Sequence, residues 1–299
     1  MTGLYNLTVR NSKLYFKDKG AFFSSLITPI ILLVLYATFL NKVYRESFVS
    51  ALPVGVKVAD KLIDGTVGAQ LFSSLLAVSC ITVSFCCNMV MVSDKASGVR
   101  ADLTVSPVKN SVLSMSYYIA TFISSLLVCS VAFLVSLLYL SQVGWFFTLK
   151  DILFIFGDII LLVLFGTALS SIINFFLSSQ GQISAVGTIV SAGYGFICGA
   201  YMPIYSFSEN LKKVLMLLPG TYGTSLIRNH SLRGIYEEMK NVGFYSKDID
   251  MIKDSIDCNL YIDGEKVKLI TMFLIVFLSV LVLIGVYIFL NLWVKRKKK

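Results

Sequence analysis

Residues 67–109 read VGAQLFSSLLAVSCITVSFCCNMVMVSDKASGVRADLTVSPVK, an apolar stretch followed by a short polar segment. No charged residue occurs between Val67 and Val92, and about 20 apolar residues are enough to cross the hydrocarbon core of a bilayer. A backbone in lipid has to satisfy its own hydrogen bonds, so this stretch is expected to be helical. The sequence therefore predicts a membrane span here, followed by a polar loop at residues 93–111.

The rest of the chain is similarly apolar, because 56% of its 299 residues are hydrophobic and only 14% are charged. An average soluble domain has about 25% charged residues. Five further stretches are long enough to span a bilayer: Phe22–Leu40, Val112–Leu140, Ile152–Leu177, Ile183–Tyr201 and Leu269–Val294. We therefore predict an all-α polytopic membrane protein, a single domain over residues 1–299 with six transmembrane helices.

The basic residues indicate the orientation of these spans. If both termini are cytoplasmic, the whole net charge of +9 lies on the inner side, as the positive-inside rule expects. The basic cluster Lys295–Lys299 directly follows the last span, which is typical of an anchor to the inner leaflet. The predicted contact of this cluster is therefore the lipid bilayer, and no nucleic-acid partner is expected.

The N-terminal residues 1–20 are predicted to form a helix in the membrane interface. On a helical wheel Leu4, Leu7, Leu14 and Tyr15 share one side, whereas Arg10, Lys13 and Lys17 share another. Such a division suits a helix lying at head-group level. The alternative is an irregular basic segment that leads into the first span.

Two segments are predicted outside the membrane on the outer side, residues 41–66 and 202–268. In the second, residues 246–256 have the character of a short polar helix, and Asp263-Gly264 is a turn signal between two short strands. These features predict a small exposed outer subdomain before the last span.

The sequence lacks the motifs that would make this chain an enzyme on its own. None of its glycines is followed by lysine, which excludes the phosphate-binding loop G-x-x-x-x-G-K-[ST]. His230 is the single histidine; it has no cluster with metal-ligand spacing and is expected to be a solvated loop residue. No catalytic residue, metal or cofactor is predicted in this chain.

Asp158 is the one ionisable residue predicted inside a span. Charged residues within membranes are costly and often mark transport paths. Asp158 is therefore either a carboxylate hydrated from the outer face or a polar contact on a transport path.

Two predicted spans carry stripes of small residues. One stripe in the fifth span recurs every fourth residue, and one in the second span follows a three/four spacing. Their members are Gly187, Ser191, Gly195 and Gly199 in the fifth span, and Gln70, Ser73, Ala77, Cys80, Ser84 and Cys87 in the second. Small residues let helices approach closely, either within one subunit or at a dimer seam or translocation path.

The polar segment from Asp94 to Pro107 resembles the cytoplasmic loop of ATP-binding-cassette transporter permeases of the type-2 exporter class. Asp94, Gly98, Ser106 and Pro107 match that loop in type and spacing. Ala101 stands where the family usually has Glu, and Asp102 follows one place later. The resemblance implies a coupling helix whose contacts to an ATPase subunit involve Asp94, Gly98, Asp102, Ser106 and Pro107.

Residues 199–228, GAYMPIYSFSENLKKVLMLLPGTYGTSLIR, resemble the segment that follows the fifth span in the same family. The matching residues are Pro203, Pro219, Thr221, Tyr222 and Arg228, with Gly220 inserted. Pro203 is expected to break the span, 207–218 to form a short helix, and 219–222 to form a turn. The implied structure is a re-entrant outer segment between the fifth and sixth spans.

The resemblance implies a permease subunit of an ATP-driven exporter in the bacterial cytoplasmic membrane. Two permease subunits, a homodimer in preference to a heterodimer, would work with two copies of a separate ATPase subunit that holds ATP and Mg. The second and fifth spans would face the central path. That path is apolar to weakly polar, which favours an amphipathic or hydrophobic cargo such as a drug, a lipid-like metabolite or a peptide.

Three other functions remain open from the sequence. A lipid-linked glycan exporter belongs to the same class of transporter. A non-transporting membrane sensor or immunity protein would use the outer segment to bind a ligand. An ion-coupled carrier would depend on Asp158.

Overall fold

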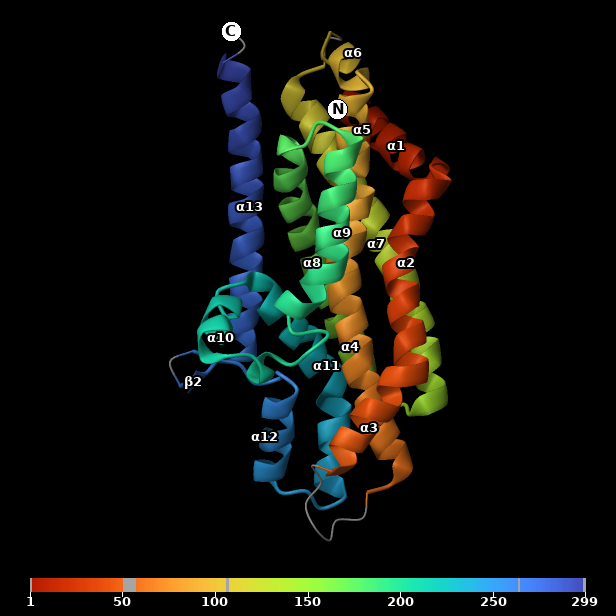
Figure 1. Cartoon of the computed structure of the whole chain (residues 1–299), viewed down its shortest axis with the longest axis vertical. Coiled ribbons are helices and arrows are strands. Elements are labelled where there is room, and N and C mark those ends of the chain that lie inside the picture. The colour runs from red at the N-terminus through yellow and green to blue at the C-terminus, as the bar shows by residue number, and fades with distance from the viewer. Residues whose placement is uncertain (1, 51–57, 106–107, 263, 298–299) are drawn as a thin grey trace.

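The computed structural model describes residues 2–50, 58–105, 108–262 and 264–297, and the chain in these ranges is almost entirely helical (Figure 1). The helices are α1 (Thr2–Lys17), α2 (Lys19–Leu35), α3 (Asn41–Ser50), α4 (Asp60–Cys87), α5 (Met89–Ala96), α6 (Val99–Val105), α7 (Asn110–Val143), α8 (Leu149–Phe176), α9 (Gln180–Ile197), α10 (Glu209–Leu215), α11 (Pro219–Asn241), α12 (Ser246–Ser255) and α13 (Leu269–Lys297). A π-helical turn, Tyr36–Leu40, joins α2 to α3, and a short 3-10 turn covers Ile204–Ser206. Strands β1 (Tyr261–Ile262) and β2 (Glu265–Lys266) pair antiparallel.

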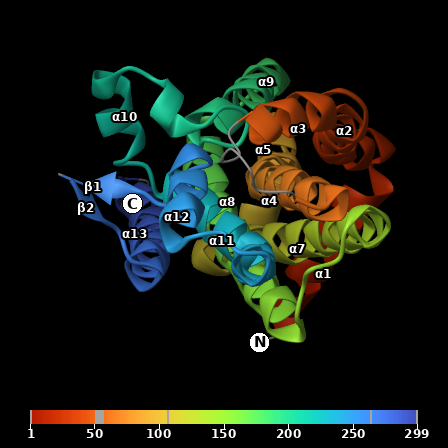
Figure 2. The ribbon, with the colours of Figure 1, turned by 90° about the horizontal axis from the view of Figure 1, so that it is seen from below.

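Helix α4 forms the centre of the molecule. Its side chains are buried on all sides from Gly65 to Cys87, and α2, α7, α8, α9 and α11 pack around it. Figure 2, seen along the long axis, shows α4 enclosed by these neighbours. Because protein covers these side chains on every side, this part of α4 lacks a lipid-facing stripe.

Within the described residues, four helices are long and apolar enough to cross a membrane: Asp60–Ala96, Asn110–Val143, Leu149–Phe176 and Leu269–Trp293. A fifth is added if α1 and α2, which are bent by 73° relative to each other, count as one broken span. The protein is therefore an all-α, multi-pass membrane protein, and four of the six predicted spans coincide with these helices. The predicted span at residues 22–40 lies along α2 and the π-helical turn.

The predicted fifth span is the one that differs most. It corresponds to α9, which begins at Gln180 and ends at Ile197, not at Tyr201. Gly199 follows with a φ of +73°, a conformation that favours glycine and commonly ends a helix. Pro203 was expected to break this span, but the helix has already ended before it.

The molecule has two ends. Both termini and α6 lie at one end, called the terminal end below, and α3 and α12 lie at the opposite, distal end (Figure 1). The continuous span α4–α5 has 37 residues and is about 55 Å long at 1.5 Å per residue. A hydrocarbon core of about 30 Å cannot contain it, so the α4–α5 span extends beyond that core.

The distal half corrects two predictions. The predicted outer loop at residues 41–66 begins as helix α3 and ends inside α4, while residues 51–57 lie outside the described ranges. The predicted small exposed subdomain is not a separate unit, because Ile249, Ile252 and Leu260 are buried in the same core as α4. Helix α11 is likewise buried along the bundle.

Several local predictions in this segment are confirmed, and one is wrong. The short polar helix is α12, and β1 and β2 flank the predicted turn, of which Asp263 lies outside the described residues. Helix α10 lies within the predicted 207–218 helix. Residues 219–222 do not form a turn, because Pro219 is the first residue of α11, where its missing N–H costs no hydrogen bond.

Candidate functional site

The predicted coupling segment begins with Asp94, which points inward. Asp94 is only 6% exposed. Its carboxylate accepts hydrogen bonds from the Arg10 guanidinium of α1 at 2.5 and 3.2 Å and from the Tyr117 hydroxyl of α7 at 2.5 Å. Asp94 therefore ties α5 to α1 and α7 within the chain, and its side chain is not presented at the surface.

Lys95, the next residue, fixes the other side of α5. Its ammonium group donates to the backbone carbonyls of Asn174, Phe175 and Leu177 at 2.6–3.1 Å and lies 5.4 Å from the centre of the Phe175 ring. The last carbonyls of a helix lack partners within it and carry partial negative charge, so a cation is favoured there. Lys95 thus attaches α5 to the end of α8, a role that the sequence did not reveal.

Helix α6 projects from this anchored base. Gly98 turns the chain between α5 and α6 with a φ of +83°. None of the seven residues of α6 is buried, and Val105 is 88% exposed. Asp102 is exposed as well, whereas Ser106 and Pro107 lie outside the described residues. Figure 1 shows α6 at the tip of the terminal end, so an exposed short helix stands on a firmly held support.

The small-residue stripe of α4 is used for packing inside the chain. Gln70, Ser73, Ala77 and Ser84 are all buried. A Cβ on Gly166 of α8 would lie 3.0 Å from the Ser84 hydroxyl, so α8 approaches α4 about as closely as two helices can. Packing within one subunit accounts for this stripe, and none of it is exposed for a second subunit.

The stripe of α9 also meets its own chain. A Cβ on Gly195 would clash with the ring of Tyr201, and one on Gly187 would lie 3.2 Å from the Met89 side chain. Ser191 is half-buried between them. Gly199 lies beyond the end of the helix, so the four residues do not form one continuous helical face.

Arg228 connects four parts of the distal half. It is 2% exposed, and its guanidinium donates to the carbonyls of Ile256 and Gly199 at 2.6 and 2.9 Å and to the Ser74 hydroxyl at 3.0 Å. The guanidinium also lies 3.8 Å from the Asp257 carboxylate. Burial raises the pKa of Asp257, an effect that the nearby Arg228 opposes. The predicted family residue Arg228 is thus the node that joins α11 to α4.

The other predicted residues of this segment hold the turn between α10 and α11. The Thr221 hydroxyl donates to the Leu215 carbonyl at 2.8 Å, and the Tyr222 hydroxyl donates to the Met216 carbonyl at 2.6 Å. Both bonds fold the start of α11 back onto the end of α10. Pro203 is half-buried directly before the 3-10 turn.

Asp158 has a partner that the sequence did not predict. Its carboxylate lies 2.6 Å from Nδ1 of His230, whose ring stacks on Phe154 at a centroid distance of 5.1 Å. Arg233 pairs with Asp151 in the same interface between α8 and α11. Asp158 is therefore neither hydrated at the surface nor unpaired, and the expectation that His230 is a solvated loop residue is wrong.

An apolar groove of about 600 Å³ lies between α8, α9, α13 and the start of α11. It is lined by Ile81, Phe85, Phe165, Leu169, Ile173, Ile189, Val190, Tyr194, Ile197, Leu218, Pro219, Gly220, Leu278, Ser279, Val282 and Leu283. The Tyr194 hydroxyl is buried there without a hydrogen-bond partner among the described residues. Apolar pockets with a few polar groups are the usual sites for small hydrophobic ligands.

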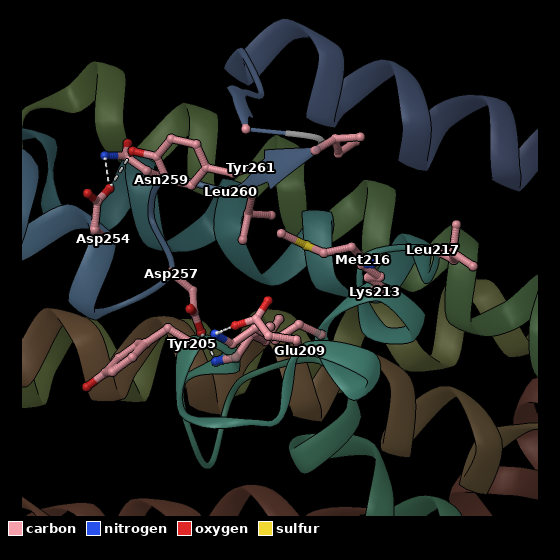
Figure 3. A pocket seen from close by; sticks show the side chains of 14 residues that line it. Tyr205, Glu209, Lys213, Met216, Leu217, Asp254, Asp257, Asn259, Leu260 and Tyr261 are labelled. Carbon is pink, nitrogen blue, oxygen red and sulfur yellow. Dashed lines mark hydrogen bonds and ion pairs between the residues drawn. The ribbon is translucent and has the colours of Figure 1, made fainter.

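A second cavity, of about 710 Å³, opens beside α10 and is partly polar (Figure 3). On one wall Asp254 accepts hydrogen bonds from Asn259 at 2.7 Å and from Tyr261 at 2.9 Å, and on another Lys212 pairs with Glu209 at 2.8 Å. Met216 and Leu217 line this cavity, and the next three residues of the chain line the apolar groove. The two cavities therefore lie on either side of one short linker.

No group of three or more His, Cys, Asp or Glu side chains within the described ranges is arranged to hold a metal ion. The sequence did not predict either cavity, since each collects residues from segments far apart in the chain.

Comparison with known proteins identifies a family. A family model described as ABC-2 type transporter matches residues 2–230, from α1 into α11. Neither the curated proteins nor the solved structures include a match to this chain.

Proposed function

The chain belongs to the ABC-2 type transporter family, and on that premise we propose that it is the permease subunit of an exporter for amphipathic or hydrophobic cargo. Membership makes it a multi-pass membrane component of an ABC transporter and not the ATPase itself. The family normally pairs with an ATP-binding subunit. Direction of transport, cargo and subunit number are parts of the proposal.

The proposed topology places the terminal end in the cytoplasm of a bacterial cell. The distribution of basic residues supports this orientation, as does the position of both termini and α6 at one end (Figure 1). The six spans would be α2, α4–α5, α7, α8, α9 and α13. Helix α9, with 18 residues, is about 27 Å long, close to the thickness of the hydrocarbon core. Residues 198–220 would form the re-entrant outer segment, because Leu218 lines the same groove as Leu278, which lies about 14 Å along α13 from its first residue.

The observation that carries the proposal is the exposed α6 on its anchored base. A separate ATPase, with ATP and Mg bound in it, would receive α6 in a cleft. Because Asp94 and Lys95 hold α5 to α1, α7 and α8, movement of α6 would be transmitted to those helices instead of being absorbed by a loose loop. Two permease chains, as a homodimer, and two ATPase subunits would form the working unit.

The cargo path is proposed along the apolar groove and the outer cavity. An amphipathic molecule would place its apolar part against α9 and α13 and its polar part beyond the 216–220 linker. The adjacency of an apolar and a partly polar cavity supports such a cargo. A lipid-linked glycan would use the same features, and remains the alternative within the family.

Larger side chains that fill the apolar groove test the proposed cargo path. We expect Leu169→Trp with Val282→Trp to lower ATP-dependent uptake of a fluorescent lysophospholipid into inverted vesicles by at least tenfold. Leu138→Trp, on the exposed face of α7, is the matched control. Uptake that is unchanged in the groove variant would overturn the path, and no uptake even by the wild type would overturn a lysophospholipid-like cargo.

A further inference from the structure

Helix α1 and helix α7 enclose a separate groove of about 750 Å³ near the terminal end. One wall consists of two neighbouring rows of α1, each repeating every fourth residue, and the other wall is formed by Ile119 and Ile123 of α7. The α1 residues are Leu4, Thr8, Ser12 and Phe16 in one row and Tyr5, Val9, Lys13 and Lys17 in the other. The groove is thus mainly apolar, with two lysines along one row.

The charged side chains that line this groove are all positive. Lys13 and Lys17 are exposed and form no ion pair with any described residue, and no carboxylate lines the groove. Asp18, the nearest acidic residue in sequence, accepts the Ala21 N–H at 3.0 Å as the cap of α2. The lining therefore complements an anion.

The side chain of Thr8 carries a hydroxyl group that also lies at this groove. It is buried, and its hydroxyl has no partner among the described residues. A buried hydroxyl without a hydrogen bond is unfavourable. Because this oxygen is covered, a ligand in the groove reaches it only if the Thr8 side chain turns toward the groove that it lines.

The position of α1 fits the membrane interface. It is bent by 73° from α2, and its opposite face is held by Arg10 on Asp94 and by Asn11 on Ser116 at 3.2 Å. Ile119 and Ile123 lie about 14 and 20 Å along α7 from its first residue. The groove therefore brings the two exposed lysines of α1 beside the two isoleucines of α7, within reach of one amphipathic molecule.

We propose that this groove binds one anionic phospholipid from the leaflet at the terminal end. Its phosphate is held by Lys13 and Lys17, and an acyl chain lies against Phe16, Ile119 and Ile123. An ester carbonyl accepts from the Thr8 hydroxyl once that side chain turns toward the groove. The bound lipid would hold α1 in place. Because Arg10 of α1 pairs with Asp94, the lipid would also stabilise α5, the support of α6.

Lipid binding to the full chain tests this directly. Native mass spectrometry of the purified protein with phosphatidylglycerol or phosphatidylcholine gives a Kd for each. We expect tighter binding of phosphatidylglycerol, and a roughly 30-fold weaker Kd in the double variant Lys13→Gln and Lys17→Gln, since each lysine near a membrane surface contributes about fivefold. Lys240→Gln with Lys247→Gln, both exposed on the distal half, should leave the Kd unchanged.

A second measurement locates the lipid. In a background of Trp145→Phe and Trp293→Phe, the fluorescence of Ile123→Trp should be quenched more by brominated phosphatidylglycerol than by the brominated phosphatidylcholine. Equal quenching by both lipids, or an unaltered Kd in the Lys13 and Lys17 variant, would overturn the proposal. Absence of quenching together with dimers cross-linked through residue 123 would assign the groove to a second copy of the chain instead.

Discussion

Arg228 is almost fully buried. The N–H groups of its planar guanidinium donate to three oxygen atoms from different parts of the chain. A lysine at position 228 would keep the positive charge, but its single ammonium group could not reach three acceptors that lie in different directions. Removal of the side chain would also leave Asp257 without its ion-pair partner.

We expect Arg228→Leu to reduce the free energy of unfolding by about 3–5 kcal/mol, the usual cost of breaking a buried pair. Arg228→Lys should be intermediate. Thermal unfolding in detergent checks both, with Arg45→Lys, a half-exposed residue, as control. An Arg228→Leu variant with the wild-type unfolding temperature would contradict the role of this node.

Gly195 leads to a second prediction at this scale. A side chain there collides with the Tyr201 ring of the same chain, so Gly195→Leu should lower the yield of folded protein several-fold. Adding Tyr201→Ala should restore much of that yield, measured by size-exclusion chromatography. If Tyr201→Ala brings no recovery, the constraint on Gly195 comes from elsewhere, such as a dimer seam.

At the scale of elements, α5 acts as the support of α6, and Lys95 is its attachment to α8. We expect Lys95→Met to keep the ATPase bound but to reduce transport per ATP hydrolysed about tenfold, because α5 can then move without α8. Transport and hydrolysis measured together in proteoliposomes test this, and Lys240→Met, exposed on the distal half, is the control. Equal loss of binding and transport would show that Lys95 has a different role.

The long apolar helices were predictable from the sequence. The runs in α7, α8 and α13 are long enough to cross a bilayer, and a backbone in lipid satisfies its own hydrogen bonds by forming a helix. Helix α11 was not predicted as a long buried helix. It buries small residues such as Gly223, where a Cβ would collide with Leu162, and small polar residues give no hydropathy signal. The Asp158–His230 pair joins residues 72 positions apart, which no local spacing can reveal. The small-residue stripes were visible, but their spacing alone did not show which chain they pack against.

For the whole molecule, the account requires the terminal end and the distal end to face opposite sides of the membrane. All six native cysteines are buried, so a single introduced cysteine can report on access. In intact cells a membrane-impermeant maleimide should label Lys247→Cys, and it should label Asp102→Cys only after the membrane is opened. The reverse pattern would invert the topology.

The central claim is that α6 engages a separate ATPase, and co-purification tests it most directly. The tagged chain is purified from its native membrane in mild detergent, beside a variant with Asp102→Arg, Thr104→Arg and Val105→Arg. A control changes three exposed positions of α12: Lys247→Glu, Asp250→Arg and Met251→Arg. The account predicts that a stoichiometric partner with a G-x-x-x-x-G-K-[ST] loop accompanies the wild type and the α12 control but is lost from the α6 variant. Folded wild-type protein without such a partner, or a partner retained equally by the α6 variant, would contradict it.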